Sequence, residues 1–492
     1  MQRVFRVRKQ RRFARGIPAL ALLLAACVTL PDVREPSLAS PDAAVRSRFA
    51  IVTEETALIE TALPSQWWSL FEDETLTALE AEAMEANMDI QAAITHIEES
   101  RAQLGLVNAT RQPQLAVDAS YTRSALSENS PLAALGAPTT GNDFWSLGLQ
   151  TGWKLDLWGH LRFVSESAEA RLRATGYGME AVKVSVAGDV ARTYLLLRGV
   201  QAQETLVEQN RQIAEELVRM AESRERNGVA TRFDTAAAHA DLAGIEAHLS
   251  RLHHQRDVLM NALALLLGKP PRDLNERLTA ADLPPIPRRL PVGIPSELAR
   301  QRPDILQAEA RLHAAVADIG AAQADFYPRI TLTGSIGVQA FEFSDLGSWA
   351  SRRYSLGPTF YLPIFEGGRL KRNLALSEAR HRLAGIDYQQ TVLRAWHEVD
   401  DALGAYSTEL KRHELLQFAM TQNRTALTVA QRAYQEGSAD FTTVLVARRS
   451  LLASQAELTD CATASALSVV ALYRALGGGW SSELAVSASD KS

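Results

Sequence analysis

The residue types that most often perform chemistry are sparse in this sequence of 492 residues and do not form a site. The densest histidine group is His239, His248, His253 and His254. On a helix the adjacent His253 and His254 diverge by about 100°, and neither a cysteine nor a carboxylate completes a metal-ligand spacing. Cys461 lies among alanines, where a buried inert thiol is expected. We therefore expect no metal, no cofactor and no enzymatic activity.

A different chemistry is indicated at Cys27. A cluster of basic residues precedes a short apolar run over residues 17–26, a pattern typical of a secretory signal peptide. The run ends in Leu24-Ala25-Ala26-Cys27, which matches the bacterial lipobox, where the thiol takes a diacylglycerol and the new amino terminus a further acyl chain such as palmitate. Each buried methylene is worth about 0.8 kcal/mol, so several chains hold a protein on a bilayer. We predict a signal peptide over residues 1–26 and a lipidated extension over 27–63; a plain signal peptide with a chance cysteine is the alternative.

The composition of the full sequence narrows the class of protein. The chain is 46% hydrophobic and 22% charged, which is typical of a globular protein. Its 52 basic and 57 acidic residues leave a formal charge of −5, too close to neutral for a nucleic-acid binder. With two cysteines, a disulfide scaffold is excluded. The sequence also lacks the roughly 18 consecutive apolar residues that a spanning helix needs.

An internal duplication organises the rest of the sequence. Its landmarks recur at a spacing of about 210 residues: Asp89-Ile90, Gly105 and Pro113 match Asp304-Ile305, Gly320 and Pro328, and Val190, Gly228 and Gly268 match Val399, Gly437 and Gly477. We predict a first copy over residues 64–283, a second copy over 296–480, a proline-rich linker over 284–295 and a tail over 481–492.

Each copy contains two segments in which apolar and polar residues alternate. They lie at about 114–123 and 144–157 in the first copy, and at about 329–340 and 353–365 in the second. Alternation with a period of two predicts strands with one apolar and one polar face. A small soluble sheet with one face in a core fits this pattern. Segments of about 9–11 residues are also long enough to cross a bilayer when tilted.

The number of strands restricts how they could span a membrane. Four strands cannot close a barrel, and open strand edges do not exist in hydrocarbon. Two chains would supply eight strands, whose interior is filled by side chains, whereas three chains would supply twelve and leave a lumen. A channel therefore requires at least a trimer.

Two proline-free helical stretches, at about 159–227 and 367–436, follow the strands. Gly199 and Gly404 lie near their centres, and we predict hairpin turns there, each joining helices about 60 Å long. Gly228 and Gly437 are predicted to cap the C-terminal ends. The mixed polarity of these helices favours coiled-coil-like packing into a wall with one water-exposed face.

Several motifs are similar to those of the TolC-like outer membrane factor family, in its NodT-type lipoprotein branch. The motifs are Pro64-Ser65-Gln66-Trp67-Trp68-Ser69-Leu70-Phe71, Arg302-Pro303-Asp304-Ile305, Phe326-Tyr327-Pro328-Arg329-Ile330 and Phe365-Glu366-Gly367-Gly368-Arg369. The resemblance covers nearly the whole mature chain. It implies an α+β membrane protein that forms a homotrimer, with a twelve-stranded β-barrel in the outer membrane and a long periplasmic α-barrel. It also implies an exit duct that works with a periplasmic adaptor and an inner-membrane pump.

The resemblance also suggests functional residues. Glu398-Val399-Asp400-Asp401-Ala402-Leu403 matches the family segment near the periplasmic tip, where an aspartate from each protomer narrows the pore. Asp401 is the first choice and Asp400 the second; ordinary solvated helix residues are the alternative. Three such carboxylates would concentrate cations, and Arg192, which pairs with Asp401 at the repeat spacing, could latch a closed state. Adaptor docking is expected at the turns around Arg198-Gly199 and Leu403-Gly404.

Sequence alone leaves some alternatives open. A protein-secretion duct would share these features, and a lipid-anchored periplasmic protein without a pore would share the helices. The exported substrate, the pump class and the secretion route are not encoded in any motif. Val28 stands where lipoproteins retained in the inner membrane usually carry aspartate, so we expect the outer membrane of a Gram-negative bacterium.

Overall fold

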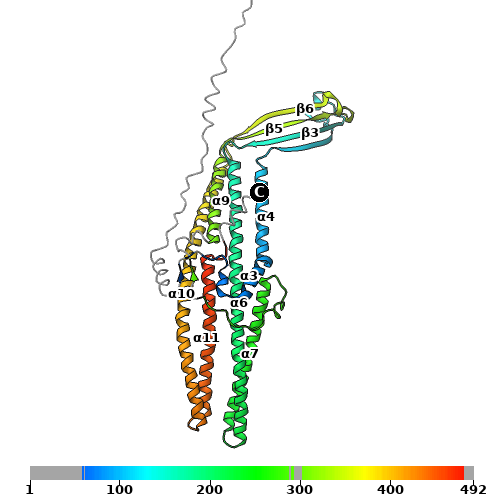
Figure 1. Ribbon diagram of the computed structural model, residues 1–492. Helices are drawn as coiled ribbons and strands as arrows, with labels where there is room; N and C mark the ends of the chain where they lie inside the picture. The colour runs from blue at the N-terminus through cyan, green and yellow to red at the C-terminus, as the bar shows by residue number, and fades with distance from the viewer. Residues whose placement is uncertain (1–57, 60, 62, 288–289, 293–301, 481–492) are drawn as a thin grey trace, which may run out of the picture. The chain divides into compact units, whose positions relative to one another are not determined.

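The computed structural model describes residues 58–59, 61, 63–287, 290–292 and 302–480 (Figure 1). The predicted signal peptide, Cys27 and the predicted tail lie outside these residues. The chain divides into two compact units. Unit 1 contains residues 102–170 and 312–384, and unit 2 contains the described parts of 36–101, 171–311 and 385–492.

Unit 1 is built around an antiparallel sheet of order β2-β3-β5-β6. Its strands are β2 (Gln114–Ser124), β3 (Asn142–Leu155), β5 (Arg329–Ala340) and β6 (Arg352–Tyr361). Short elements lie in the connections: α5 (Pro131–Ala134) and the 3-10 helices η3 (Phe343–Gly347) and η4 (Trp349–Ser351). β6 ends at Tyr361, earlier than the predicted strand end at about residue 365, because Pro363 lacks the backbone N–H that a strand ladder needs.

Long helices dominate the chain. They are α3 (Glu74–Ala86), α4 (Met88–Ala109), α6 (His160–Arg226), α7 (Arg232–Leu266), α9 (Pro303–Ala324), α10 (Arg369–Gln435) and α11 (Phe441–Leu476). The 3-10 helix η1 (Trp67–Phe71) precedes them, and β1 (Leu58–Ile59) pairs in parallel with β4 (Leu290–Pro291). Among the described residues, none of these helices has both the length and the apolar character to cross a membrane.

The duplication is visible in the element lengths. α4 and α9 have 22 residues each, α6 and α10 have 67 each, and α7 and α11 have 35 and 36. Each copy therefore runs helix, two strands, very long helix and long helix. An internal two-fold repeat is confirmed.

The predicted hairpin turns at Gly199 and Gly404 are wrong. Both glycines lie inside uninterrupted helices, α6 and α10. A glycine inside a helix costs only about 1 kcal/mol relative to alanine, which packing against another helix can offset. Gly199 lies so close to Thr463 of α11 that a Cβ would collide with the threonine side chain. The glycine therefore permits close helix packing and does not mark a turn.

The real turns lie at residues 227–231 and 436–440 (Figure 1). Gly228 and Gly437 have φ values of +73° and +75°, a left-handed conformation that favours glycine. Their predicted role as caps at the helix ends is therefore confirmed. After the first turn, the Asp234 carboxylate accepts a 2.9 Å hydrogen bond from the Thr231 N–H and helps to start α7.

Unit 2 has one large apolar core. It is formed by η1, α3, α6, α7, α10, α11 and the segment after α7. Trp67 is fully buried and stacks on Tyr473, with ring centroids 5.4 Å apart and planes 6° apart. The core thereby joins the start of the folded chain to the last helix, across both copies of the repeat.

Candidate functional site

The sheet of unit 1 has two chemically different faces. Residues directly opposite each other in a ladder point to the same face, so the register assigns every side chain. One face is apolar in all four strands: Leu115, Val117 and Tyr121 of β2; Trp145, Leu147, Leu149, Trp153 and Leu155 of β3; Ile330, Leu332, Ile336 and Val338 of β5; and Tyr354, Leu356 and Phe360 of β6. The predicted amphipathic strands are confirmed.

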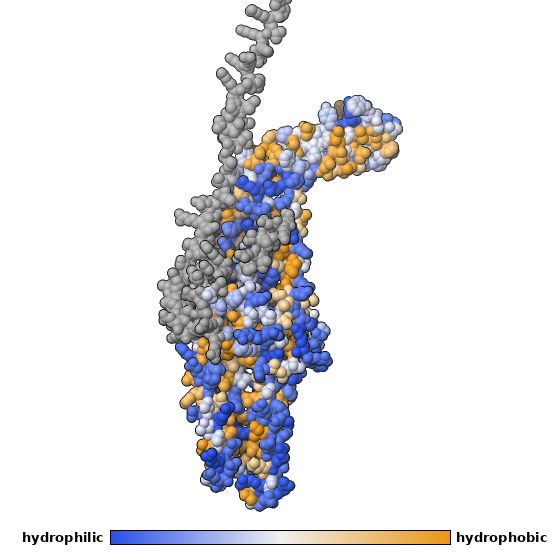
Figure 2. Space-filling model, in the orientation of Figure 1, coloured by the Kyte–Doolittle hydropathy of each residue, from blue (hydrophilic) through white to orange (hydrophobic). Residues whose placement is uncertain are grey.

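The apolar face is exposed in the single chain. Leu115 is 71% exposed, Leu356 78% and Tyr354 82%, and Figure 2 shows hydrophobic side chains gathered along the sheet. A contiguous exposed surface of this kind marks contact with another apolar phase or molecule. A soluble sheet with this face in its own core is therefore excluded for the described residues.

The opposite face is polar or small, apart from the aromatic rings of Phe144 and Tyr361 near strand ends. It carries Gln114, Asp118 and Ser120 of β2; Ser146, Gly148, Gln150, Gly152 and Lys154 of β3; Thr331, Thr333, Ser335, Gly337 and Gln339 of β5; and Arg353, Ser355, Gly357 and Thr359 of β6. A sheet with one apolar and one hydrated face suits the wall of a water-filled barrel in a membrane.

Aromatic side chains gather near both ends of the strands. Near the loops, Tyr121 contacts Trp145 at 4.3 Å between centroids, and Trp145 contacts Phe343 at 5.1 Å. At the opposite end, Trp158 stacks on Tyr327 at 5.0 Å, and its indole N–H donates to the Pro328 carbonyl at 2.7 Å. Aromatic belts of this kind are typical of the two interfaces of a membrane.

Among the described residues, the sheet is open at both edges, because β2 and β6 each pair with one strand. Unpaired edges in hydrocarbon would leave backbone N–H and carbonyl groups unsatisfied. The sheet can therefore enter a membrane only when other copies of the chain complete it.

Arg198, a predicted docking residue, is buried within unit 2 and is not at a turn. Its guanidinium donates to the Tyr194 hydroxyl at 3.0 Å and to the Thr279 carbonyl at 2.7 Å. The Tyr194 hydroxyl donates in turn to Asp73, the N-cap of α3, at 2.7 Å. Burial and the hydrogen bond to Asp73 raise the pKa of Tyr194 to about 12. Because these bonds are internal, Arg198 fixes the core of unit 2.

The other predicted docking residues also lie along the helices. Leu403 is 2% exposed and belongs to the core of unit 2. Gly404 follows it inside α10, where its carbonyl accepts from the Thr408 hydroxyl at 2.8 Å. The expectation of adaptor docking at these residues assumed hairpin turns there, and that assumption is wrong, because they lie inside the continuous helices α6 and α10.

Asp401 and Arg192 lie on the surface of unit 2. Asp401 is exposed in α10, and Arg192 is exposed in α6; no ion pair joins these two within the described part of the chain. Asp401 precedes Gly437 by about ten helical turns, or roughly 54 Å. The expectation that its segment lies at the hairpin end is therefore wrong. Asp400 is half-buried beside it.

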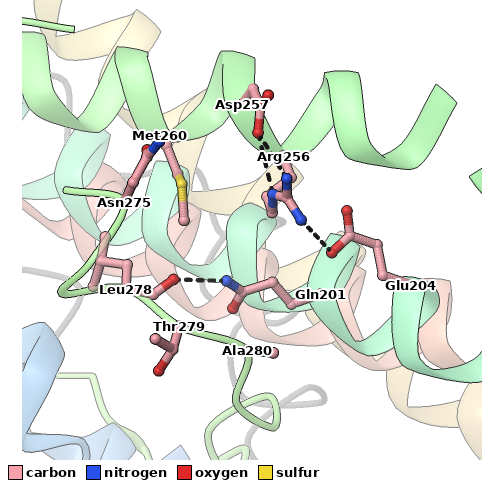
Figure 3. A pocket seen from close by; sticks show the side chains of 9 residues that line it. All are labelled: Gln201, Glu204, Arg256, Asp257, Met260, Asn275, Leu278, Thr279 and Ala280. Atoms are coloured by element: carbon pink, nitrogen blue, oxygen red, sulfur yellow. Dashed lines mark hydrogen bonds and ion pairs between the residues drawn. The ribbon is translucent and has the colours of Figure 1, made fainter. Parts of the chain in front are cut away.

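A pocket of about 260 Å³ lies between α6, α7 and the segment after α7 (Figure 3). Arg256 bridges Glu204 at 3.4 Å and Asp257 at 3.0 Å. The Gln201 amide donates to the Leu278 carbonyl at 3.0 Å. One guanidinium faces two carboxylates, and the described lining contains no cysteine, serine, histidine or lysine, so the pocket does not pair a nucleophile with an activating base.

The hairpin ends are functional candidates that the sequence reasoning misplaced. At the first turn Val229 is 64% exposed and Phe233 69%. At the second turn Phe441 is buried and packs on Tyr434 at 5.7 Å. The Asn227-Gly228 pair was the available signal, since this dipeptide is typical of a turn.

An amphipathic sheet with two open edges, attached to long paired helices, defines the subunit of an oligomeric membrane channel. The family model described as outer membrane efflux protein matches residues 79–269 and 294–478. The toluene efflux pump outer membrane protein TtgI of Pseudomonas putida is 33% identical, covering 95% of this chain and 98% of its own. The probable outer membrane lipoprotein SilC of Salmonella typhimurium is 29% identical, covering 93% and 97%.

Solved structures agree with these relatives. The outer-membrane channel OprN has a TM-score of 0.85 and 31% identity to this chain, covering 92% of this chain and all of its own. The chain belongs to the outer membrane efflux protein family. It is an outer membrane efflux channel protein and not an enzyme, with the trimeric α-barrel and β-barrel fold of that family.

Proposed function

We propose that three copies of the chain form the exit duct of a tripartite efflux system, which passes small molecules outward when docked to a periplasmic adaptor and an inner-membrane pump. The observation that carries this proposal is the four-stranded sheet, with an apolar face, a hydrated face and two open edges. Three copies supply twelve strands, enough to leave a lumen, whereas two copies would fill the interior with side chains.

The purified protein in planar lipid bilayers tests this function. A heat-labile trimer with discrete ion conductance supports the duct. A protein that is monomeric after removal of its lipid, and does not conduct, would favour the alternative of a periplasmic lipoprotein without a pore. Export of a folded protein with a partner pump, without export of small molecules, would favour the secretion duct.

We also propose that Cys27 is the lipidated first residue of the mature chain, and that residues 1–26 are removed. The lipobox carries this proposal, together with the similarity to SilC, whose name describes a probable lipoprotein. Mass spectrometry of the N-terminal peptide should find a diacylglyceryl group and an amide-linked acyl chain. Cys27→Ser should remove both, and an unmodified Cys27 in the mature protein would refute the proposal.

Adaptor docking is proposed at residues 227–231 and 436–440, the hairpin turns of the structure. Val229 and Phe233 support it, because two large exposed apolar side chains at one turn suit a protein contact. In cells with the adaptor, a photo-crosslinking residue at 229 should capture the adaptor, and one at Arg198 should not. Equal capture at both positions would contradict this placement.

The constriction by Asp401, with Asp400 as second choice, and the latch by Arg192 remain proposals. Three exposed carboxylates around one axis would attract cations. Asp401→Asn should then lower cation preference, and Arg192→Ala should raise single-channel conductance. If Arg192→Ala leaves the conductance unchanged, the latch is excluded.

The division of the chain is also a proposal. We propose a first repeat over residues 64–283, a second repeat over 296–480 and a linker between them, because the landmarks of the sequence recur in these two segments.

A further inference from the structure

The hydrated face of the sheet carries an imbalance of charge. Within the part of the single chain that the structure describes, its ionic side chains without an ion-pair partner are Lys154 of β3 and Arg353 of β6, against Asp118 of β2. A fourth charge, Arg329, is tied to Asp325 by a 2.8 Å ion pair. We propose that Lys154 and Arg353 make the outer-membrane lumen selective for anions, so that this part of the duct favours organic anions as substrates. The inference rests on the proposed function, because it assumes that this face lines the lumen.

Arg353 lies in a row that contains two glycines and, at the far edge in β2, Asp118. The ladder places it opposite Gly337 of β5, which is opposite Gly148 of β3. Because neither glycine has a side chain, the guanidinium can extend across β5 and donate to the Ser146 hydroxyl of β3 at 3.0 Å. This bond to a neutral hydroxyl holds the guanidinium on the hydrated face and does not neutralise its charge.

Lys154 supplies a second positive charge on the hydrated face, in a different row of the sheet. The ladder places it opposite Thr331, which is opposite Thr359. Lys154 is exposed, and its row and that of Arg353 are about six residues apart along the strands, or roughly 20 Å. This separation exceeds the screening length of about 8 Å at physiological salt, so each charge acts on a passing ion by itself.

Three-fold repetition turns each residue into a ring. Charges of one sign on a passage with low-dielectric walls raise the local concentration of the opposite ion. Three copies of Lys154 and Arg353 supply six positive charges against three from Asp118, so the sheet part would attract anions, whereas a ring of Asp401 in the helical part would attract cations. Because the sheet and Asp401 lie in different units of the chain, separate substitutions can distinguish their effects.

The test is the reversal potential of the full-length trimer in planar bilayers under a potassium chloride gradient. The double variant K154Q/R353Q should lower the chloride-to-potassium permeability ratio by about twofold or more, and K154E/R353E should lower it further. Arg352→Gln is the matched control. Arg352 is the neighbour of Arg353 but lies on the apolar face, over the Trp349 ring at 3.2 Å, so its loss should leave the ratio unchanged.

Each outcome decides between explanations. An unchanged ratio in both double variants would overturn the inference while the channel itself stands. Equal falls in R352Q and K154Q/R353Q would also overturn it, because the effect would not depend on the face. Arg353→Lys keeps the charge and should keep the ratio, which separates charge from the Ser146 contact. A wild-type trimer without conductance would instead refute the proposed function.

Discussion

Gly148 of β3 and Gly337 of β5 lie directly opposite each other, and a Cβ on Gly337 would collide with the Leu147 carbonyl oxygen. The two strands approach so closely at this point that only glycine fits. The same row carries Arg353, whose reach across the sheet depends on the missing side chains. The close packing of β3 and β5 and the position of Arg353 in the proposed selectivity therefore both depend on the missing side chains of Gly148 and Gly337.

Gly337→Ala should weaken the sheet. Overpacking a rigid position costs about 1–3 kcal/mol, and here the obstacle is backbone, which cannot rotate away. The trimer should dissociate at a lower temperature on SDS gels. Gly357→Ala is the control, because Gly357 lies on the same face with no atoms near its missing Cβ. Equal thermal shifts for the two variants would contradict the proposed steric cause.

Gly199→Ala should destabilise unit 2, although alanine is the better helix former. The new methyl group would collide with Thr463 of α11. Gly244→Ala in α7 meets open space and should stabilise the protein by up to about 1 kcal/mol. Urea unfolding measures both changes. Thr463→Ala should rescue Gly199→Ala; without such rescue, steric contact is not the cause.

Arg302→Met should cost about 3 kcal/mol of unfolding free energy. The buried guanidinium bonds Asp304 and Glu398, each at 2.7 Å, and the Ala475 carbonyl at 2.8 Å. Breaking a buried pair costs about 3–5 kcal/mol, and the partly exposed carboxylates here can regain water, which places the cost at the lower end. Arg394→Met, at an exposed position of α10, should change urea unfolding little. Similar losses for both would show that burial of Arg302 is unimportant.

The ion pair between His160 and Asp325, 3.1 Å long, should make stability depend on pH. The hydrogen bond to Asp325 raises the pKa of His160. This stabilisation is fully present below about pH 6.5 and is lost as the pH rises through the raised value. Burial raises the pKa of Asp325, but His160 and Arg329 outweigh it and leave the pKa lowered. That contribution is present above about pH 3.9 and is lost as the pH falls through the lowered value.

Thermal melting near pH 6 and near pH 8.5 checks this. The wild type should be more stable relative to His160→Gln at the lower pH, and the difference should shrink at the higher one. His239→Gln is the control, because the His239–Glu222 pair is exposed on both sides and contributes little. A constant difference between wild type and His160→Gln at both pH values would refute the linkage.

Much of the fold could be predicted from local patterns. Alternation identified the four strands and gave each of them one apolar and one polar face. The glycines at 228 and 437 identified the helix ends, because a left-handed residue is a local requirement. Strand alternation and helix-end glycines depend on residues only a few positions apart in the chain, so they can be recognised in the sequence.

The missed features depend on contacts distant in sequence. Gly199 has the appearance of a helix breaker, and only its approach to Thr463 reveals a packing glycine. Arg198 has the appearance of a surface residue, and only Asp73, Tyr194 and Thr279 reveal why it is buried. With those glycines read as turns, Asp401 was expected near a hairpin end that in fact lies about ten helical turns beyond it.

By itself the sequence determined the duplication, the two-faced strands and the need for several chains to complete the sheet, because periodicity and strand number are written along the chain. Only the tertiary structure decided that the long helices are continuous and that Arg353 stands over two glycines. Those facts arise from side chains brought together from distant parts of the chain, where close packing and hydrogen bonding override local preference.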